Sequence, residues 1–167
     1  EKLIYLAANC LEAIPILYSI KYFKTIQAKD QKLSKSQLWH MDTTHKKIFK
    51  IFWSPKGVSS LQGPTTICKT GKKSKIWQYT NYPNFPSYFT DEQFKKSKLN
   101  KFETNEILLE NKELSICDTC NLFHFGSRFN NERWIVILEF APFKRFDYFH
   151  KPDKELSEVN ELITSMF

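Results

Sequence analysis

Short stretches in which apolar and polar residues alternate run through most of this chain. In such a stretch every second side chain faces the same way, which is the pattern of a β-strand that buries one face. The stretches are rich in Tyr, Ile, Phe and Trp, which favour strands, and polar or Pro- and Gly-containing segments separate them. The pattern predicts strands at 16–26, 37–42, 47–53, 65–68, 76–80, 106–109, 113–117, 122–125 and 133–140.

Helical spacing of apolar residues occurs mainly near the two ends of the chain. The apolar residues within 2–13 have helical spacing and share one face, which predicts a helix. We expect Pro15 to end that helix because it lacks a backbone donor. Residues 152–167 predict an amphipathic helix with Pro152 in its first turn. The apolar face of this second helix is formed by Leu156, Val159, Leu162, Ile163 and Met166.

One stretch follows neither period. Residues 81–101 contain two prolines and several aromatic residues, so we treat them as a variable insertion with one helical turn at 91–96. Many short strands with few helices predict a mainly β barrel or sandwich. A length of 167 residues is that of one ordinary domain, so we expect a single domain over 1–167. Because the chain opens on Glu1 rather than Met and its first residues already have the pattern of a helix interior, we expect the natural protein to extend further upstream.

The composition is that of an ordered globular protein. Hydrophobic residues make up 41% of the chain and aromatic residues 16%, which excludes a disordered, low-complexity chain. Four cysteines are too few for a disulfide scaffold at this length, so we expect a reducing cytoplasm as the compartment. The most apolar stretch, 3–17, is interrupted by Asn9, Glu12 and Pro15, so no membrane span is expected.

The charge balance is basic but not concentrated. Lys and Arg number 25 against 18 Asp and Glu, which gives a formal net charge of +7. A basic surface can attract nucleic acid, an anionic membrane or acidic metabolites. Only 69–75 and 95–101 form local basic clusters, and both lie in polar stretches that predict solvated loops. We therefore do not expect a nucleic-acid partner.

Candidate metal ligands occur in the predicted strand 37–42. Its sequence, QLWHMD, places His40 and Asp42 two residues apart, so in a strand both side chains point to one face. Two histidines and one carboxylate on one face of an octahedron leave three positions open, as in non-haem iron(II) oxygenases. His124 is the better candidate for the second histidine, because His45 follows too closely and His150 lies beyond the last strand.

Arg133 is the candidate anion-binding residue. It begins the apolar strand 133–140, where a charged side chain needs a partner. If it points inward, its guanidinium suits a carboxylate through two parallel hydrogen bonds. The alternative is a residue at the end of a strand that pairs with Glu132, Glu139 or solvent.

These features follow one another in the order found in a known family. Pro15-Ile16-Leu17 precedes QLWHMD, and the strand FKIFW at 49–53 and the Gly63-Pro64 turn come next. Asp118-Thr119, then His124-x-Gly126, and finally Arg133 close the series. In this order, and over nearly its whole length, the chain resembles the phytanoyl-CoA dioxygenase-like oxygenases.

The resemblance implies a fold, a cofactor set and a reaction. The fold is a double-stranded β-helix (jelly roll, cupin-like) with flanking N- and C-terminal helices. His40, Asp42 and His124 bind Fe(II), and Arg133 binds 2-oxoglutarate, which reacts with O2 to give succinate and CO2 while a small-molecule substrate is hydroxylated. Asp42 favours hydroxylation, because the related halogenases lack this carboxylate. The distance from His124 to Arg133 is slightly shorter than is usual in the family, and Arg128 is a less favoured substitute for Arg133.

Two other functions remain open from the sequence. One is a nucleic-acid base demethylase with the same ligands, although the paired arginines of such enzymes are not evident after His124. The other is a non-catalytic jelly-roll binding protein. The pair Cys117 and Cys120 is expected to be small and buried, because no second pair accompanies it to bind zinc. Lys50 faces either the cofactor or the solvent.

Overall fold

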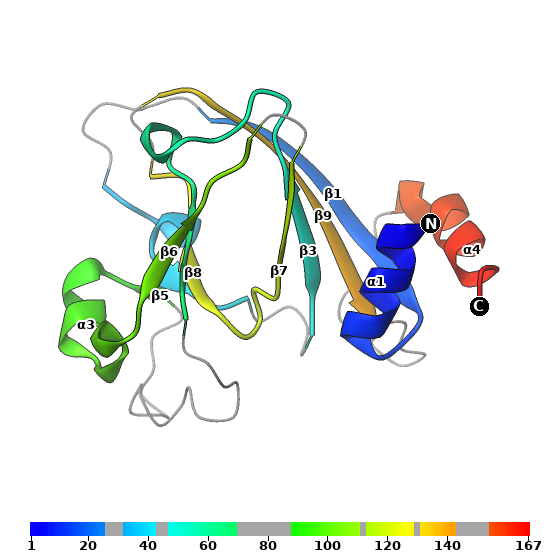
Figure 1. Cartoon of the computed structure of the whole chain (residues 1–167), viewed down its shortest axis with the longest axis horizontal. Helices are drawn as coiled ribbons and strands as arrows, with labels where there is room; N and C mark the ends of the chain where they lie inside the picture. Colours follow the sequence, from blue (N-terminus) through cyan, green and yellow to red (C-terminus); the bar gives the residue numbers. More distant parts are fainter. Residues whose placement is uncertain (26–31, 43–46, 70–87, 111–112, 129–130, 143–153) are drawn as a thin grey trace.

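In the computed structural model, two antiparallel sheets face each other, with helices on their outer faces (Figure 1). The structure describes the chain except for residues 26–31, 43–46, 70–87, 111–112, 129–130 and 143–153. The described elements are α1 (Lys2–Leu11), β1 (Pro15–Thr25), η1 (Lys35–Gln37), β2 (Trp39–His40), β3 (Phe49–Trp53), η2 (Ser60–Gln62), β4 (Thr65–Cys68), β5 (Tyr88–Phe89), α3 (Asp91–Lys96), η4 (Lys98–Lys101), β6 (Thr104–Ile107), β7 (Leu114–Cys117), β8 (Phe123–Phe125), β9 (Arg133–Pro142), η5 (Lys154–Leu156) and α4 (Ser157–Thr164).

The strand order shows a double-stranded β-helix. The first sheet has the order β1-β9-β3-β7, and the second sheet has the order β5-β2-β8-β4-β6. Strands from the two halves of the chain interleave, because β9 lies between β1 and β3 while β8 lies between β2 and β4. The chain crosses repeatedly from one sheet to the other, as in a jelly roll. The predicted fold class is therefore confirmed.

Successive side chains of β3 point alternately to the outer face of the first sheet and to the space between the sheets. Phe49 and Ile51 face outward and pack with residues of α1 and α4, whereas Phe52 faces the space between the sheets. That interior also contains Val58, Leu109, Cys117 and Ile135. Strands that are buried on both faces need apolar residues at successive positions, which explains the run FKIFW.

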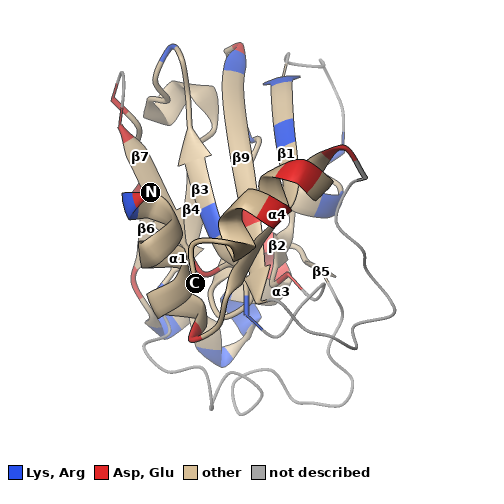
Figure 2. Cartoon of the chain, turned by 90° about the vertical axis from the view of Figure 1, so that its right-hand side faces the viewer, with Lys and Arg blue, Asp and Glu red and all other residues tan. Residues whose placement is uncertain are grey.

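Helices cover the outer faces of both sheets. α1 and α4 lie on the outer face of the first sheet and leave the upper ends of β7, β9 and β1 uncovered in Figure 2. On the second sheet, Trp39, Phe89 and Phe123 form a cluster with Phe94 of α3 and Leu99 of η4. None of the helices in the described residues has the length and apolar character needed to cross a membrane.

A helix is present near each end of the chain, with differences in detail, and Pro152 lies outside the described residues. α1 ends at Leu11 because Glu12 adopts a left-handed conformation with φ 54°, so the helix stops before Pro15, which instead begins β1. In the C-terminal helix, Leu156 and Ile163 are buried, whereas Val159 and Leu162 of the predicted apolar face are exposed. The helix packs mainly against β1, and part of its apolar face stays exposed.

Most predicted strands are present, and the exceptions are informative. Strand β2 comprises only Trp39–His40, so the prediction of a strand over 37–42 was too long. The predicted strand at 76–80 lies outside the described residues. Within the predicted insertion 81–101, the helical turn at 91–96 is confirmed as α3, and Tyr88–Phe89 form a strand that pairs with β2. The basic cluster at 95–101 is not a loop, because it includes the end of α3 and the turn η4.

Candidate metal centre

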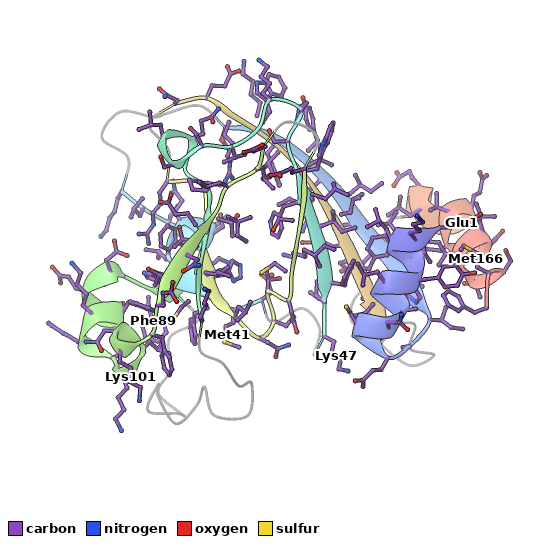
Figure 3. The ribbon with its side chains drawn as sticks, viewed as in Figure 1. Glu1, Met41, Lys47, Phe89, Lys101 and Met166 are labelled. Carbon is purple, nitrogen blue, oxygen red and sulfur yellow. The ribbon has the colours of Figure 1, made fainter. Side chains whose placement is uncertain are left out.

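Two histidines lie opposite each other on neighbouring strands. β2 pairs with β8 so that His40 is directly opposite His124, and the ring centroids are 4.2 Å apart. Opposite residues of an antiparallel pair point to the same face of a sheet. Their neighbours Trp39 and Phe123 pack on the outer face, so both imidazoles point into the space between the sheets. Figure 3 shows side chains of both sheets directed into this space, with Met41 at its lower edge.

Backbone carbonyls fix the orientation of both imidazole rings. Nδ1 of His40 lies 2.8 Å from the Leu38 carbonyl oxygen, and Nδ1 of His124 lies 3.0 Å from that of Leu122. A carbonyl can only accept, so each neutral ring carries its proton on Nδ1 and keeps a lone pair on Nε2. Both rings therefore offer Nε2 as a ligand atom.

Asp42 provides a carboxylate next to both rings. Its backbone N–H donates to the Thr119 carbonyl at 3.0 Å, which fixes the chain just after β2. Oδ1 lies 3.9 Å from Nε2 of His40, and Oδ2 lies 4.0 Å from Nε2 of His124. The three residues can place one ligand atom each within 4.8 Å of one another, the only such group of three found in the described residues.

The charges of this group suit a divalent metal ion. Burial, together with neighbouring His40, lowers the pKa of His124 to about 4. Burial alone would raise the pKa of Asp42, but Lys50 and His124 lower it overall. At neutral pH His124 is therefore neutral and Asp42 is ionised. A first-row divalent metal requires its ligands in this deprotonated form.

Arg133 is buried at the start of β9 without a carboxylate partner among the described residues. Its side chain shares the inward face of β9 with Ile135, and the residue is only 4% exposed. Nη1 donates to the Gly63 carbonyl at 2.6 Å, Nη2 donates to Ser127 Oγ at 2.5 Å, and Nε has no partner. Burial lowers the pKa of Arg133 to about 10. An arginine stays charged at neutral pH even so, and a buried cation of this kind favours an anion beside it.

The strand that carries His124 also leads to Arg133. Gly126 follows His124 by two residues, and a Cβ at this position would lie 3.9 Å from Arg133 Nη1 and 3.4 Å from Thr65 Oγ1. These are ordinary van der Waals distances, so Gly126 lies directly beside the guanidinium. The Gly63-Pro64 turn and Gly126, both noted in the sequence, are neighbours of Arg133 in space.

The alternative partners proposed for Arg133 are engaged elsewhere. Glu139 pairs with Lys21 and Lys50, and Glu132 pairs with Lys24 and Lys56. Arg133 is thus not neutralised by either glutamate.

Arg128, the less favoured substitute, lies on the other side of the second sheet. Its Nη1 pairs with Asp91 at 2.8 Å, and its guanidinium lies 3.5 Å from the Phe125 ring centroid. Arg128 and Phe125 line a groove of about 660 Å³ on that outer face, together with Trp39 and Phe94. None of the three candidate metal ligands lines this groove. Arg128 is therefore separated from the histidine pair by the sheet itself.

The sequence also singled out the pair Cys117 and Cys120 and the histidines His45 and His150. Cys117 and Cys120 are buried, as predicted, and burial raises the pKa of Cys117 to about 12. The four cysteines, all within the described part of the chain, form no disulfide. His45 and His150 lie outside the described residues.

Lys50 does not face the solvent, because its side chain is only 11% exposed. Its Nζ lies 2.7 Å from Asp42 Oδ2 and 2.8 Å from Glu139 Oε1. Sequence reasoning missed this role of Glu139. The signal was present, because Glu139 is a charged residue inside the apolar strand 133–140.

The fold and the site can be compared with known proteins. No family model matches the chain, and no curated protein sequence matches it. The structure is similar to that of SnoN, a non-haem alpha-ketoglutarate-dependent epimerase from nogalamycin biosynthesis, with a TM-score of 0.54 and 9% identity. This similarity covers 84% of the chain and 52% of SnoN, so the chain spans about half of that protein.

Two further solved structures share the fold. ThoJ, a non-haem monooxygenase in its apo form, gives a TM-score of 0.53 at 7% identity, over 98% of the chain and 68% of ThoJ. HygX from Streptomyces hygroscopicus, solved with nickel, 2-oxoglutarate and hygromycin B bound, gives 0.50 at 12% identity, over 94% of the chain and 68% of HygX. At these identities the similarity shows the fold alone. The chain thus has the jelly-roll fold of these non-haem enzymes.

Proposed function

We propose that this chain is an Fe(II)- and 2-oxoglutarate-dependent oxygenase domain that hydroxylates a small molecule. The observation that carries the proposal is that a candidate metal site and a buried cation both point into the interior of one jelly roll. One is the group His40, Asp42 and His124, and the other is the buried guanidinium of Arg133. A metal ion satisfies the first, and a dicarboxylate that chelates the metal at one end satisfies the second at its other end.

In this proposal, the three ligand residues hold the metal and leave three coordination positions open. The two imidazoles bind through Nε2, because Leu38 and Leu122 hold the Nδ1 protons. With iron bound, 2-oxoglutarate and O2 supply the chemistry, in which oxidative decarboxylation to succinate and CO2 drives hydroxylation of the substrate. The carboxylate of Asp42 occupies a position that a halide would need, which favours hydroxylation over halogenation.

The remaining interior residues orient the cofactor and exclude water. Arg133 binds the distal carboxylate of 2-oxoglutarate through its guanidinium, for which the unpartnered Nε is a suitable donor. Phe52, Val58, Leu109 and Ile135 form an apolar interior between the sheets. An apolar, water-poor surrounding strengthens the charge interactions at the metal and limits side reactions.

The motif order supports membership of the phytanoyl-CoA dioxygenase-like family, and the complex of HygX with hygromycin B supports a small-molecule substrate. The absence of disulfides among the described residues supports a reducing cytoplasm. Both α1 and α4 pack on the first sheet, which supports a single domain over the whole chain.

An anaerobic titration tests the proposal. Adding 2-oxoglutarate to the protein with Fe(II) should produce a visible charge-transfer band in the green, and admitting air should produce succinate. His40→Ala and His124→Ala should each abolish the band, because each removes one of three ligands. Absence of both band and succinate in the folded wild-type protein would falsify the proposal.

A further inference from the structure

Lys50 is held between a candidate metal ligand and a second carboxylate. Its Nζ lies 2.7 Å from Asp42 Oδ2 and 2.8 Å from Glu139 Oε1. The Lys50 side chain is 11% exposed and that of Glu139 only 6% exposed. A lysine enclosed by two carboxylates has little freedom to move, so its position next to Asp42 is fixed by the first sheet.

This contact distinguishes the two oxygens of Asp42. Oδ2 lies 2.7 Å from the Lys50 ammonium and 4.0 Å from His124 Nε2, whereas Oδ1 lies 3.9 Å from His40 Nε2. The backbone of Asp42 is also fixed, through its hydrogen bond to the Thr119 carbonyl. Because both ends of the residue are restrained, the carboxylate has little freedom to turn both oxygens toward a metal.

We infer that Lys50 is a positioning residue that restricts Asp42 to binding the metal through one oxygen. The inference rests on the proposed function. Two imidazoles and one carboxylate oxygen fill three of six octahedral positions, 2-oxoglutarate fills two, and dioxygen requires the last. A carboxylate that bound through both oxygens would occupy a position that the cofactor or dioxygen needs.

The inference predicts opposite effects on the two ligands when Lys50 is replaced. Without the ammonium, Asp42 keeps its full charge and can offer both oxygens, so it should bind Fe(II) more tightly. The same change should weaken 2-oxoglutarate, because one of its two positions becomes contested. A loss of local structure would instead weaken both ligands together.

Lys50→Met is the appropriate variant, and Lys21→Met is its matched control. Methionine has nearly the length of lysine without its charge, and Glu139 keeps Lys21 and Ser19 as partners at 2.7 and 2.5 Å. Lys21 pairs with the same glutamate but is not a partner of Asp42, and its side chain is 45% exposed. Both variants change the net charge equally, so they separate direct contact with Asp42 from a general change of charge. Lys50→Arg, which keeps a cation and donors, should restore wild-type behaviour in large part.

The experiment measures two affinities in the absence of dioxygen. Fe(II) binding is followed by competition with a chelating dye, and 2-oxoglutarate binding to the iron-loaded protein is followed by the charge-transfer band. Lys50→Met should bind Fe(II) roughly threefold or more tightly and 2-oxoglutarate roughly tenfold more weakly, as expected when a charge contact is removed from a buried site. Lys21→Met should change either affinity by less than about twofold, because Lys21 does not contact Asp42 and its side chain is 45% exposed.

The outcomes separate this inference from the proposed function. If Lys50→Met weakens both ligands in parallel, or changes neither, Lys50 has only a structural role and the inference is wrong. If wild-type protein binds no Fe(II) or no 2-oxoglutarate, the proposed function itself fails. Circular dichroism of each variant confirms that the affinities are compared between folded proteins.

Discussion

At the scale of single residues, Arg133 is the clearest sign that the interior binds an anion. It is 4% exposed, its Nε has no partner, and the two bonds that its other nitrogens donate go to neutral oxygens. One acceptor belongs to Ser127, a non-glycine residue with φ 60°. Residues in sparsely populated backbone regions persist where the surroundings fix them, and they are enriched at binding sites.

Replacing Arg133 should therefore affect the cofactor more than the metal. Arg133→Met should weaken 2-oxoglutarate binding by about tenfold to a hundredfold while Fe(II) binding stays near the wild-type value, because a charged, two-pronged contact to a carboxylate is lost. The titration of the charge-transfer band measures the first affinity, and dye competition measures the second. Arg128→Met is the control, since Arg128 pairs with Asp91 on the far side of the second sheet. Unchanged cofactor affinity in Arg133→Met would show that another residue binds the distal carboxylate.

The four cysteines differ in exposure, because Cys10 is exposed and the other three are buried. Burial raises the pKa of Cys68 to about 11 and that of Cys117 to about 12, whereas Cys10 is exposed. The thiolate is the reactive form, so at pH 8 a thiol reagent should modify Cys10 rapidly and leave the buried thiols unmodified. As the pH rises toward their pKa values, a larger fraction of the buried thiols is ionised, so their labelling should become faster. A Cys10→Ser variant should show no fast phase until denaturant is added, and rapid labelling of several thiols in native protein would contradict the described core.

At the scale of elements, the termini of the chain protect the edge of the first sheet. β1 is an edge strand, and no strand of the described residues pairs with its outer side. Asn160 of α4 accepts from the Leu17 N–H at 2.7 Å and donates to the Leu17 carbonyl at 3.1 Å. This position is next to the register shift between Leu17 and Ser19. One side chain thus attaches the C-terminal helix to the N-terminal strand.

Asn160→Ala should destabilise the protein measurably. The change leaves a half-buried N–H and C=O without these partners, which costs about 1–3 kcal/mol in the free energy of unfolding. Urea denaturation measures that free energy. Glu161→Ala is the control, because Glu161 is exposed on the same helix and its removal should cost less than about 0.5 kcal/mol. Equal effects of the two variants would show that the Asn160 bonds contribute nothing specific.

At the same scale, the sequence pattern gave the positions of most strands but not their ends. Alternation marks a strand where one face is buried, and a run of successive apolar residues marks a strand buried on both faces, such as β3. The end of a strand is set by the partner strand, which a local pattern does not contain. Asp42 is an example, because β2 ends at His40 and the backbone of Asp42 bonds to Thr119 instead of a neighbouring strand.

At the scale of the whole molecule, the site connects the two sheets. The histidines come from the second sheet, whereas Lys50 and Glu139 come from β3 and β9 of the first. The buried chain of contacts from Asp42 through Lys50 to Glu139 crosses the interior. Ligand binding at this site should therefore stabilise the fold as a unit.

A thermal shift experiment measures that coupling. A ligand that binds only the folded state at about a hundred times its Kd adds about 2.7 kcal/mol, which for a chain of this length raises Tm by about 5–10 °C. We expect such a shift for wild-type protein with Ni²⁺ and 2-oxoglutarate under nitrogen, and little shift for His124→Ala. A similar shift in both proteins would place the metal at another site.

The sequence alone determined the class of fold and the identity of the candidate ligands, because both depend on local features. Alternation of apolar residues is a property of neighbours along the chain, and the motif order from His40 to Arg133 is written in the sequence itself. Tertiary structure alone decided what each charged residue contacts. Pairing of β2 with β8 brought His124 opposite His40, and the interior placed Lys50 between Asp42 and Glu139. Among the described residues, it gave Arg133 no carboxylate partner. Such contacts join residues far apart in the sequence, so their distances follow from sheet pairing and packing and not from local propensity.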